Sequence, residues 1–169
     1  MNYSPKHTDN AMRVLYGANF FFSIVLLMLG EGIWRTIGVS VGMVLLVIAT
    51  YLFIRYELTT FTYILNAKQH DFDFFVDKIT GKRGSYVCYY PISSAVYLGS
   101  GKGLKKQLRK KYKNIVFYNY MHNRFGINKS IIVFQHAKGE FDGIIFECND
   151  AYKEYLKNAI LLTEKYKNR

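Results

Sequence analysis

The sequence has little proline, little cysteine and little acidic charge: two Pro, two Cys, and 12 Asp and Glu against 23 Lys and Arg in 169 residues. So little proline excludes collagen-like and proline-rich chains, and two cysteines are too few for a disulfide scaffold. Half of the residues are hydrophobic and 17% are aromatic. A chain this apolar can offset its ordering entropy by burial, which excludes disorder. Its length allows one ordinary domain, or a smaller domain with an anchor, and its formal net charge is +11.

Two long stretches contain no charged residue: residues 14–30 and 36–54, with the runs FFFSIVLLML and VGMVLLVIA. As helices they would reach roughly 25 and 28 Å, close to the thickness of a bilayer core, about 30 Å. A cleaved signal peptide would be followed by polar mature sequence, and a soluble helix pair would have a polar face; the sequence has neither. It therefore predicts a transmembrane helical hairpin over residues 14–55.

The charges beside the hairpin predict its orientation. Lys6 and Arg13 precede the first helix and Arg55 follows the second, whereas Glu31 and Arg35 cancel in the short connector. Because positive residues accumulate on the cytoplasmic side, we expect both termini in the cytoplasm. The expected location is the plasma membrane, as a multi-pass protein integral to the lipid bilayer.

Two glycines in the second apolar stretch have the spacing of a helix-packing motif. Gly38 and Gly42 form a small-xxx-small pair, which allows another helix to approach closely. The first helix of the same chain is the default partner, and self-association is the alternative.

Residues 57–169 have the pattern of a cytoplasmic domain that follows an N-terminal tail, residues 1–13, and the hairpin. Local alternation and turn signals predict seven strands. The strands are residues 61–65, 72–79, 86–90, 94–98, 115–121, 130–135 and 142–148. A helix capped by Asn149 or Asp150 is expected through Tyr166. Its predicted apolar face is Tyr152, Tyr155, Leu156, Ala159, Ile160 and Tyr166. The predicted fold class is α+β: two transmembrane helices, then an antiparallel seven-stranded bent sheet or open barrel capped by a C-terminal helix.

Seven strands followed by one C-terminal helix resemble the pleckstrin-homology-like (PH-like) fold. A two-helix hairpin before such a domain resembles the small bacterial membrane proteins with PH-like domains, which form largely uncharacterised families. The most similar stretch is residues 71–98, where strand, glycine turn, strand and the segment YYPISSAVYL follow the order of the family. The resemblance implies a fold and a membrane location. Eukaryotic relatives often bind phosphoinositides or peptides, usually through loops between the early strands.

The strongest local feature is GKGLKKQLRKKYK, residues 101–113. Its basic residues are Lys102, Lys105, Lys106, Arg109, Lys110, Lys111 and Lys113. Leu104, Leu108 and Tyr112 recur every four residues, so a helix here would carry a narrow apolar stripe between basic flanks. This composition is typical of a segment at an anionic membrane surface, where each basic residue contributes roughly 1 kcal/mol. A solvated loop and a contact with a protein partner or nucleic acid are the alternatives; the lack of a nucleic-acid-binding motif disfavours nucleic acid.

The sequence contains no clear motif for catalysis, a metal or a cofactor. The fragment GSGKG departs from a phosphate-binding loop, because Val96 occupies the first glycine position and Gly103 replaces Ser or Thr. The four histidines are scattered without metal-ligand spacing. Cys88 and Cys148 fall in predicted strands, where they are most simply small apolar residues. We therefore expect no catalytic residue, no metal and no cofactor.

These features favour a membrane-anchored, non-enzymatic adaptor or sensor, whose cytoplasmic domain contacts either the anionic inner leaflet or a protein partner. The alternative is an accessory subunit of a larger membrane complex. An enzyme acting on lipid or envelope substrates is a third hypothesis, for which the sequence offers no nucleophile or base.

Overall fold

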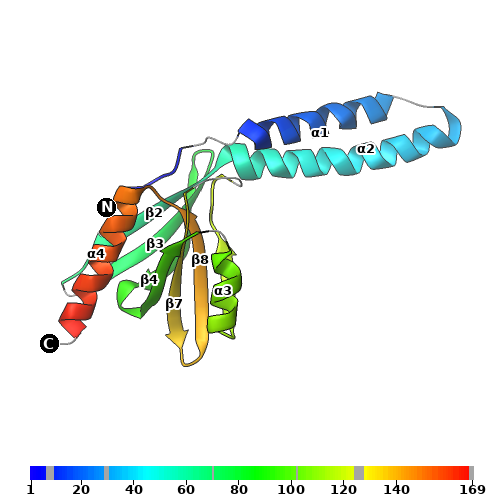
Figure 1. Ribbon diagram of the computed structural model, residues 1–169. Coiled ribbons are helices and arrows are strands. Elements are labelled where there is room, and N and C mark those ends of the chain that lie inside the picture. Colours follow the sequence, from blue (N-terminus) through cyan, green and yellow to red (C-terminus); the bar gives the residue numbers. More distant parts are fainter. Residues whose placement is uncertain (7–9, 29–30, 70, 102, 124–127, 168–169) are drawn as a thin grey trace. The chain divides into compact units, whose positions relative to one another are not determined.

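The computed structural model describes residues 1–6, 10–28, 31–69, 71–101, 103–123 and 128–167. The chain divides into two compact units (Figure 1). One unit is His7–Thr59, which contains both apolar stretches. The other unit, called the domain below, combines Met1–Lys6 with Thr60–Arg169. The chain therefore leaves the domain, forms the hairpin and returns to the same domain.

The hairpin unit consists of two helices that pack along each other, α1 (Asn10–Met28) and α2 (Gly32–Phe53), and a π-helical turn, η1 (Ile54–Leu58). Both helices are long and apolar enough to cross a membrane, by length and composition. Each begins four residues before the predicted uncharged stretch. Helix α1 therefore includes Arg13, whose guanidinium pairs with the Glu57 carboxylate at 2.8 Å.

The first sheet of the domain has four strands in the order β1-β2-β3-β4. The strands are β1 (Asn2–Tyr3), β2 (Thr59–Ala67), β3 (Phe72–Thr80) and β4 (Arg83–Pro91). The sequence did not predict β1, which pairs antiparallel with β2. Two hydrogen bonds hold it there: the N-terminal amine of Met1 donates to the Leu65 carbonyl at 2.6 Å, and the Leu65 N–H donates to the Met1 carbonyl at 2.8 Å.

The second sheet also has four strands, in the order β5-β7-β8-β6. The strands are β5 (Ala95–Ser100), β6 (Ile115–Asn119), β7 (Lys129–Ala137) and β8 (Glu140–Glu147). Helix α3 (Leu104–Lys111) carries the chain from β5 at one edge to β6 at the other edge. As a result β6 pairs with β8 in parallel, whereas the other pairs of this sheet are antiparallel.

The prediction of a single antiparallel seven-stranded sheet was wrong. The described residues form two sheets of four strands, and one strand pair is parallel. The break comes after β4, where Pro91 and the 3₁₀ turn η2 (Ile92–Ser94) end the strand. The partition into two sheets depends on pairing between distant segments, which leaves no mark in the local alternation of residues.

The main hydrophobic core lies between the two sheets and helix α4 (Asp150–Lys167). Asn149 caps α4, because its Oδ1 accepts a hydrogen bond of 2.8 Å from the Tyr152 N–H. The buried residues of α4 are Tyr152, Leu156, Ala159 and Thr163. Tyr155 and Tyr166 were predicted on the buried face but are 37% and 47% exposed. Both lie at the margin of the helical stripe, where the sheets no longer cover it.

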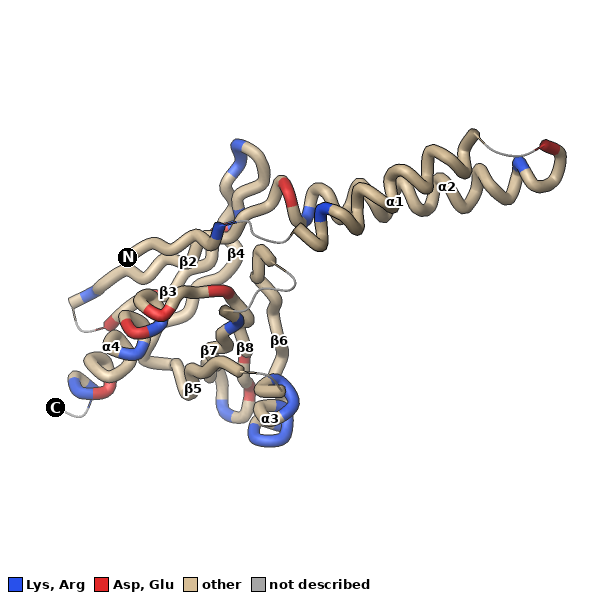
Figure 2. The backbone as a smooth tube through the Cα atoms, turned by 45° about the horizontal axis from the view of Figure 1, so that its top comes forward, with Lys and Arg blue, Asp and Glu red and all other residues tan. Residues whose placement is uncertain are grey.

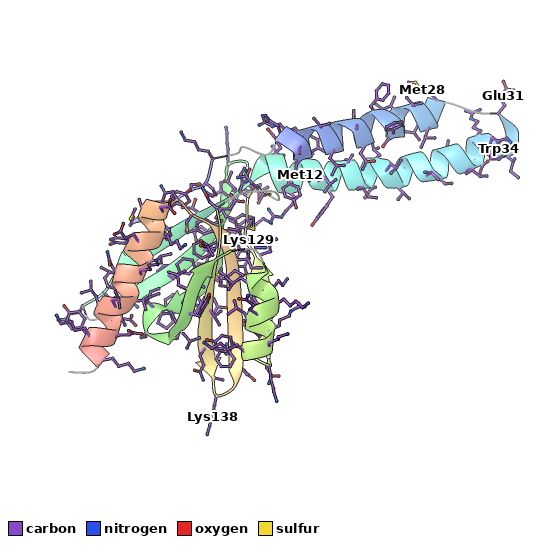
Figure 3. All side chains as sticks on the ribbon, in the orientation of Figure 1. Met12, Met28, Glu31, Trp34, Lys129 and Lys138 are labelled. Atoms are coloured by element: carbon purple, nitrogen blue, oxygen red, sulfur yellow. The ribbon has the colours of Figure 1, made fainter. Side chains whose placement is uncertain are left out.

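The two ends of the domain are called proximal and distal below. The proximal end contains Lys6 and Thr60, where the chain leaves for the hairpin and returns. Glu147, the last residue of β8, lies there too, since Asn123 donates to its carboxylate at 2.6 and 2.8 Å and to the Lys6 carbonyl at 3.0 Å. The distal end contains the β7–β8 turn, marked by Lys138 in Figure 3.

Candidate functional surfaces

Helix α3 carries most of the basic residues predicted to form the functional surface (Figure 2). Its apolar stripe consists of Leu104 and Leu108, which are 8% and 2% exposed. Both leucines pack in a second apolar cluster, formed with residues of β7, β8 and their neighbours. The stripe therefore packs inside the domain and is not available for insertion into a bilayer.

The other face of α3 is basic. The exposed basic residues are Lys105, Lys106, Arg109, Lys110, Lys111 and, after the helix, Lys113. None of them forms an ion pair with a residue that the structure describes. Lys105 Nζ and Arg109 Cζ lie 5.1 and 5.7 Å from the ring centre of Phe117 instead. Such contacts hold the cations in place without neutralising them. Lys102, the remaining predicted site residue, lies outside the described residues.

Helix α3 lies toward the distal end of the domain. Tyr112, which follows the helix, packs on Phe141 with ring centres 4.6 Å apart. Phe141 precedes Glu147 by six residues of β8, about 20 Å along a strand. Phe117 pairs with Gly143, about 13 Å from Glu147 by the same rise. The positions of Phe117, which Lys105 and Arg109 contact, and of Phe141, which Tyr112 contacts, are thus both farther from Glu147 at the proximal end than a Debye length of about 8–10 Å.

Gly42 lies where the two helices of the hairpin touch, and Gly38 precedes it by one turn, half-buried. A Cβ on Gly42 would lie 3.1 Å from both the Leu27 Cγ and the Ser23 carbonyl oxygen. The absence of a side chain therefore allows α1 to approach α2 closely at this point.

A groove of about 340 Å³ lies between α1 and α2 on another part of the hairpin. The residues that line it are Tyr16, Gly17, Phe20, Ala49, Thr50 and Phe53. A Cβ on Gly17 would meet no described atom within 4 Å. The hairpin therefore has a concave, largely apolar surface that its own side chains do not fill.

The two cysteines are not activated as nucleophiles. Burial raises the pKa of the Cys88 thiol to about 12, although a hydrogen bond with Tyr120 acts in the opposite direction. Burial also raises the pKa of Cys148, whose Sγ lies in a hydrogen bond of 3.3 Å with the Ser130 hydroxyl. Because the thiolate is the nucleophile, neither group is prepared for covalent chemistry at neutral pH.

A polar cluster from three strands was missed by sequence reasoning. The Tyr90 hydroxyl donates to the Asp142 carboxylate at 2.7 Å, and His136 Nδ1 lies 3.4 Å from the same carboxylate. His136 Nε2 lies 3.1 Å from Glu140. The two imidazole nitrogens thus face two carboxylates, which is not the arrangement of a general base beside a nucleophile. Among the described residues, no group of three His, Cys, Asp or Glu is arranged to hold a metal ion.

The β3–β4 turn is a second basic site. The sequence predicts that a turn lies here, but it does not predict at which end of the domain the turn lies. Thr80 pairs with Arg83 across Gly81, whose φ is +60°, and Lys82. A positive φ at the first turn residue favours glycine there. Glycine and its basic neighbours were visible in the sequence, but the end of the domain at which the turn lies depends on strand direction.

Comparison with protein-family models, with curated proteins and with solved structures finds no match to this chain. The fold and surfaces define an α+β domain with two four-stranded sheets, joined at both connections to a hairpin apolar enough to cross a membrane.

Proposed function

We propose that this chain is a membrane-anchored, non-enzymatic adaptor with a PH-like cytoplasmic domain. In this proposal α1 and α2 cross the plasma membrane, and the basic face of α3 binds an acidic surface of a protein partner. One observation carries the proposal: Met1–Lys6 and Thr60–Arg169 fold as one unit although the hairpin separates them in sequence. The two sheets and the C-terminal helix are compatible with the PH-like resemblance.

A domain built from both flanks of a hairpin supports an even number of membrane crossings. Strand β1 precedes α1 and pairs with β2, which follows α2, so both flanks belong on one side of a bilayer. Cleavage of the first helix as a signal peptide would remove β1 from its sheet, which disfavours that alternative. Only 11% and 17% of the most apolar windows of the two helices are buried within the chain, which disfavours a soluble core helix pair. The flanking Lys6, Arg13 and Arg55 favour the cytoplasmic side.

The basic face of α3 is better suited to an acidic protein surface than to the leaflet. Its cations have no described carboxylate partner, and its leucines are buried, so it offers charge but no apolar wedge. It also lies toward the distal end of the domain. Charge complementarity of this kind accelerates association and selects the partner.

Binding of a fluorescent poly-glutamate peptide to the full chain in phosphatidylcholine nanodiscs tests this surface. Fluorescence anisotropy should give salt-sensitive binding to the unmodified chain. The double variant K106E/K110E should lose affinity by roughly tenfold or more, because two attractive contacts become repulsive. The matched control K157E/K165E, which reverses two exposed charges of α4, should retain it.

Equal loss in both variants would contradict a specific role of α3 and leave only a general effect of net charge. Displacement of the peptide from α3 when phosphatidylglycerol is added to the discs would favour the inner leaflet as the occupant of this surface. Failure of the unmodified chain to bind the peptide at low salt would contradict the proposal outright.

The groove between α1 and α2 favours a second candidate, an accessory subunit of a larger membrane complex. The unfilled space beside Gly17 would accept a side chain from a helix of another subunit. This candidate predicts co-purification with a defined partner in mild detergent, lost in Gly17→Leu but retained in Val44→Leu, a change at an exposed position on α2. A monomer that carries no other protein would contradict it.

A further inference from the structure

The β3–β4 turn lies at the proximal end of the domain, beside both connections to the hairpin. Strand β2 begins at Thr59, directly after η1, and runs for nine residues. The chain then reverses at a turn closed by a 2.8 Å hydrogen bond from the Lys68 N–H to the Asp71 carbonyl. The nine residues of β3 bring it back to the level at which β2 began. Thr80 is therefore level with the start of β2, and the turn extends beyond it.

This turn is positively charged. Its basic residues are Lys78, Lys82 and Arg83, of which the last two are exposed. None of the three forms an ion pair with a described residue. Asp77 is the acidic residue of the same hairpin tip, so three positive charges stand against one negative charge.

Other residues of the proximal end extend the positive surface. Lys6 is exposed, and Lys129, labelled in Figure 3 at the start of β7, is half-buried. The carboxylate of Glu147 does not offset them at the surface, because the residue is 4% exposed and accepts hydrogen bonds from Asn123.

An exposed aromatic side chain accompanies these cations on β4. Tyr86 is 59% exposed, and its ring lies edge-on to that of Phe75, with centres 6.2 Å apart. Tyrosine, with an apolar ring and a polar tip, is enriched where a bilayer meets water. The tip of the β3–β4 hairpin thus combines the two side-chain types found at headgroup level.

We infer that the β3–β4 turn is the surface with which the domain contacts the anionic headgroups of its own bilayer. This inference rests on the proposed crossing of the membrane by α1 and α2, but not on the partner proposed for α3. Thr59 follows Leu58 of η1 without a linker, so the covalent connection alone keeps the start of β2 near the membrane. A tethered basic surface needs little intrinsic affinity, because its local concentration at the leaflet is high.

The two basic surfaces of the domain then have different partners. The turn lies at the proximal end and contacts headgroups, whereas the cations of α3 lie more than a Debye length away and stay available to a soluble partner. Docking through the turn would hold the domain against the leaflet and leave α3 accessible.

Quenching of a fluorophore beside the turn tests the inference on the full chain in nanodiscs. Bimane is attached to Ser85→Cys, an exposed position on β4, and the quencher is a lipid with a spin label on its headgroup. Quenching should be stronger in discs with phosphatidylglycerol than in phosphatidylcholine discs, and high salt should remove the difference. The variant K82A/R83A should lower the ratio of docked to undocked domain by roughly 30-fold, about fivefold for each charge removed.

The matched control is K110A/K138A, which removes two exposed charges from α3 and the distal turn. It should leave the quenching unchanged. Quenching that does not depend on lipid charge or salt would overturn the inference. A fall in quenching in K110A/K138A but not in K82A/R83A would overturn it as well. A chain that does not remain with the discs on gel filtration would instead contradict the proposed membrane anchor, so the two failures are distinguishable. An unchanged melting temperature of K82A/R83A in phosphatidylcholine discs shows that the variant is folded.

Discussion

The Cys88 thiol remains protonated because of its surroundings. The residue is half-buried on β4, and burial raises its pKa to about 12 against the smaller opposing effect of the Tyr120 hydrogen bond. A solvent-exposed cysteine, with a pKa of about 8.5, has a thiolate fraction near neutral pH that is larger by roughly three orders of magnitude. The residue identity was visible in the sequence, but the environment that sets its reactivity was not.

We therefore predict that neither native cysteine reacts with maleimide or Ellman's reagent in the folded chain at neutral pH. Both should react after unfolding, because the pKa of each thiol then returns to its ordinary range. Ser85→Cys, exposed on the same strand as Cys88, is the positive control and should react fully without denaturant. Rapid modification of Cys88 in the native chain, followed by peptide mass spectrometry, would contradict this account.

Several tyrosines make the domain sensitive to alkali. Burial is the largest cause of the raised pKa of Tyr63, Tyr90 and Tyr152. In the unfolded chain these phenols lose their protons at a pH of about 10, and in the folded domain they do so only at higher pH. Unfolding then releases protons, so the stability from the neutral phenols is fully present below pH of about 10 and is lost as the pH rises above it.

The thermal midpoint of the full chain should accordingly stay level between a pH of about 8 and 9.5 and fall steadily above a pH of about 10. Tyr90→Phe should remove only part of this loss of stability, because Tyr63 and Tyr152 still release their protons on unfolding. A thermal midpoint that is constant through the alkaline range would show that the phenols titrate equally in both states.

At the scale of elements, the sequence indicated the apolar stripe that a helix over residues 101–113 would carry, but it predicted neither that α3 forms nor what covers the stripe. Four-residue spacing identifies the leucines, and the same spacing is typical of a membrane-surface helix and of a packed helix. The strands that bury Leu104 and Leu108 lie up to about 40 residues away in sequence. For the same reason β1 was missed, since a two-residue strand is recognisable only from its partner β2.

Because the apolar stripe of α3 is packed, substitutions on its two faces should change the free energy of unfolding by clearly different amounts. Leu108→Ala should lower the free energy of unfolding by about 2–4 kcal/mol, because it leaves a cavity in a closed apolar cluster. Lys106→Ala, on the exposed face, should change it by less than about 0.5 kcal/mol. Chemical denaturation of the full chain in mild detergent measures both changes. A destabilisation by Leu108→Ala no larger than that of Lys106→Ala would mean that the helix does not pack as described.

The elements predicted best are those whose signal is local. The two membrane-length helices follow from length and apolarity, and α4 follows from a cap and a helical stripe. The seven strand positions were close to the observed ones, but their division into two sheets was not predicted, because register and partner are long-range properties. The basic turn was likewise visible as a turn, and only the directions of β2 and β3 give its place at the proximal end.

At the scale of the whole molecule, the central feature is that a membrane-length hairpin is inserted into a folded domain. Two apolar stretches joined by a short connector predict from the sequence that both flanks of the hairpin lie on one side of a membrane, and the sheet shared by β1 and β2 favours the same arrangement from the fold. The choice of the cytoplasmic side rests on the flanking positive charges alone. The apolar stretches and the β1–β2 pairing are independent features, because one concerns lipid and the other concerns backbone hydrogen bonds. The proposed topology therefore has Asn2 and the main part of the domain on the cytoplasmic side, and the connector at Glu31 on the other side.

Labelling of single introduced cysteines with a membrane-impermeant maleimide tests this topology. Asn2→Cys, Ser85→Cys and Glu31→Cys, all at exposed positions, are compared in right-side-out and inverted membrane vesicles. We expect labelling of Asn2→Cys and Ser85→Cys in inverted vesicles alone, and of Glu31→Cys in right-side-out vesicles alone. Labelling of all three from the same side, or of Asn2→Cys and Ser85→Cys from opposite sides, would contradict this topology.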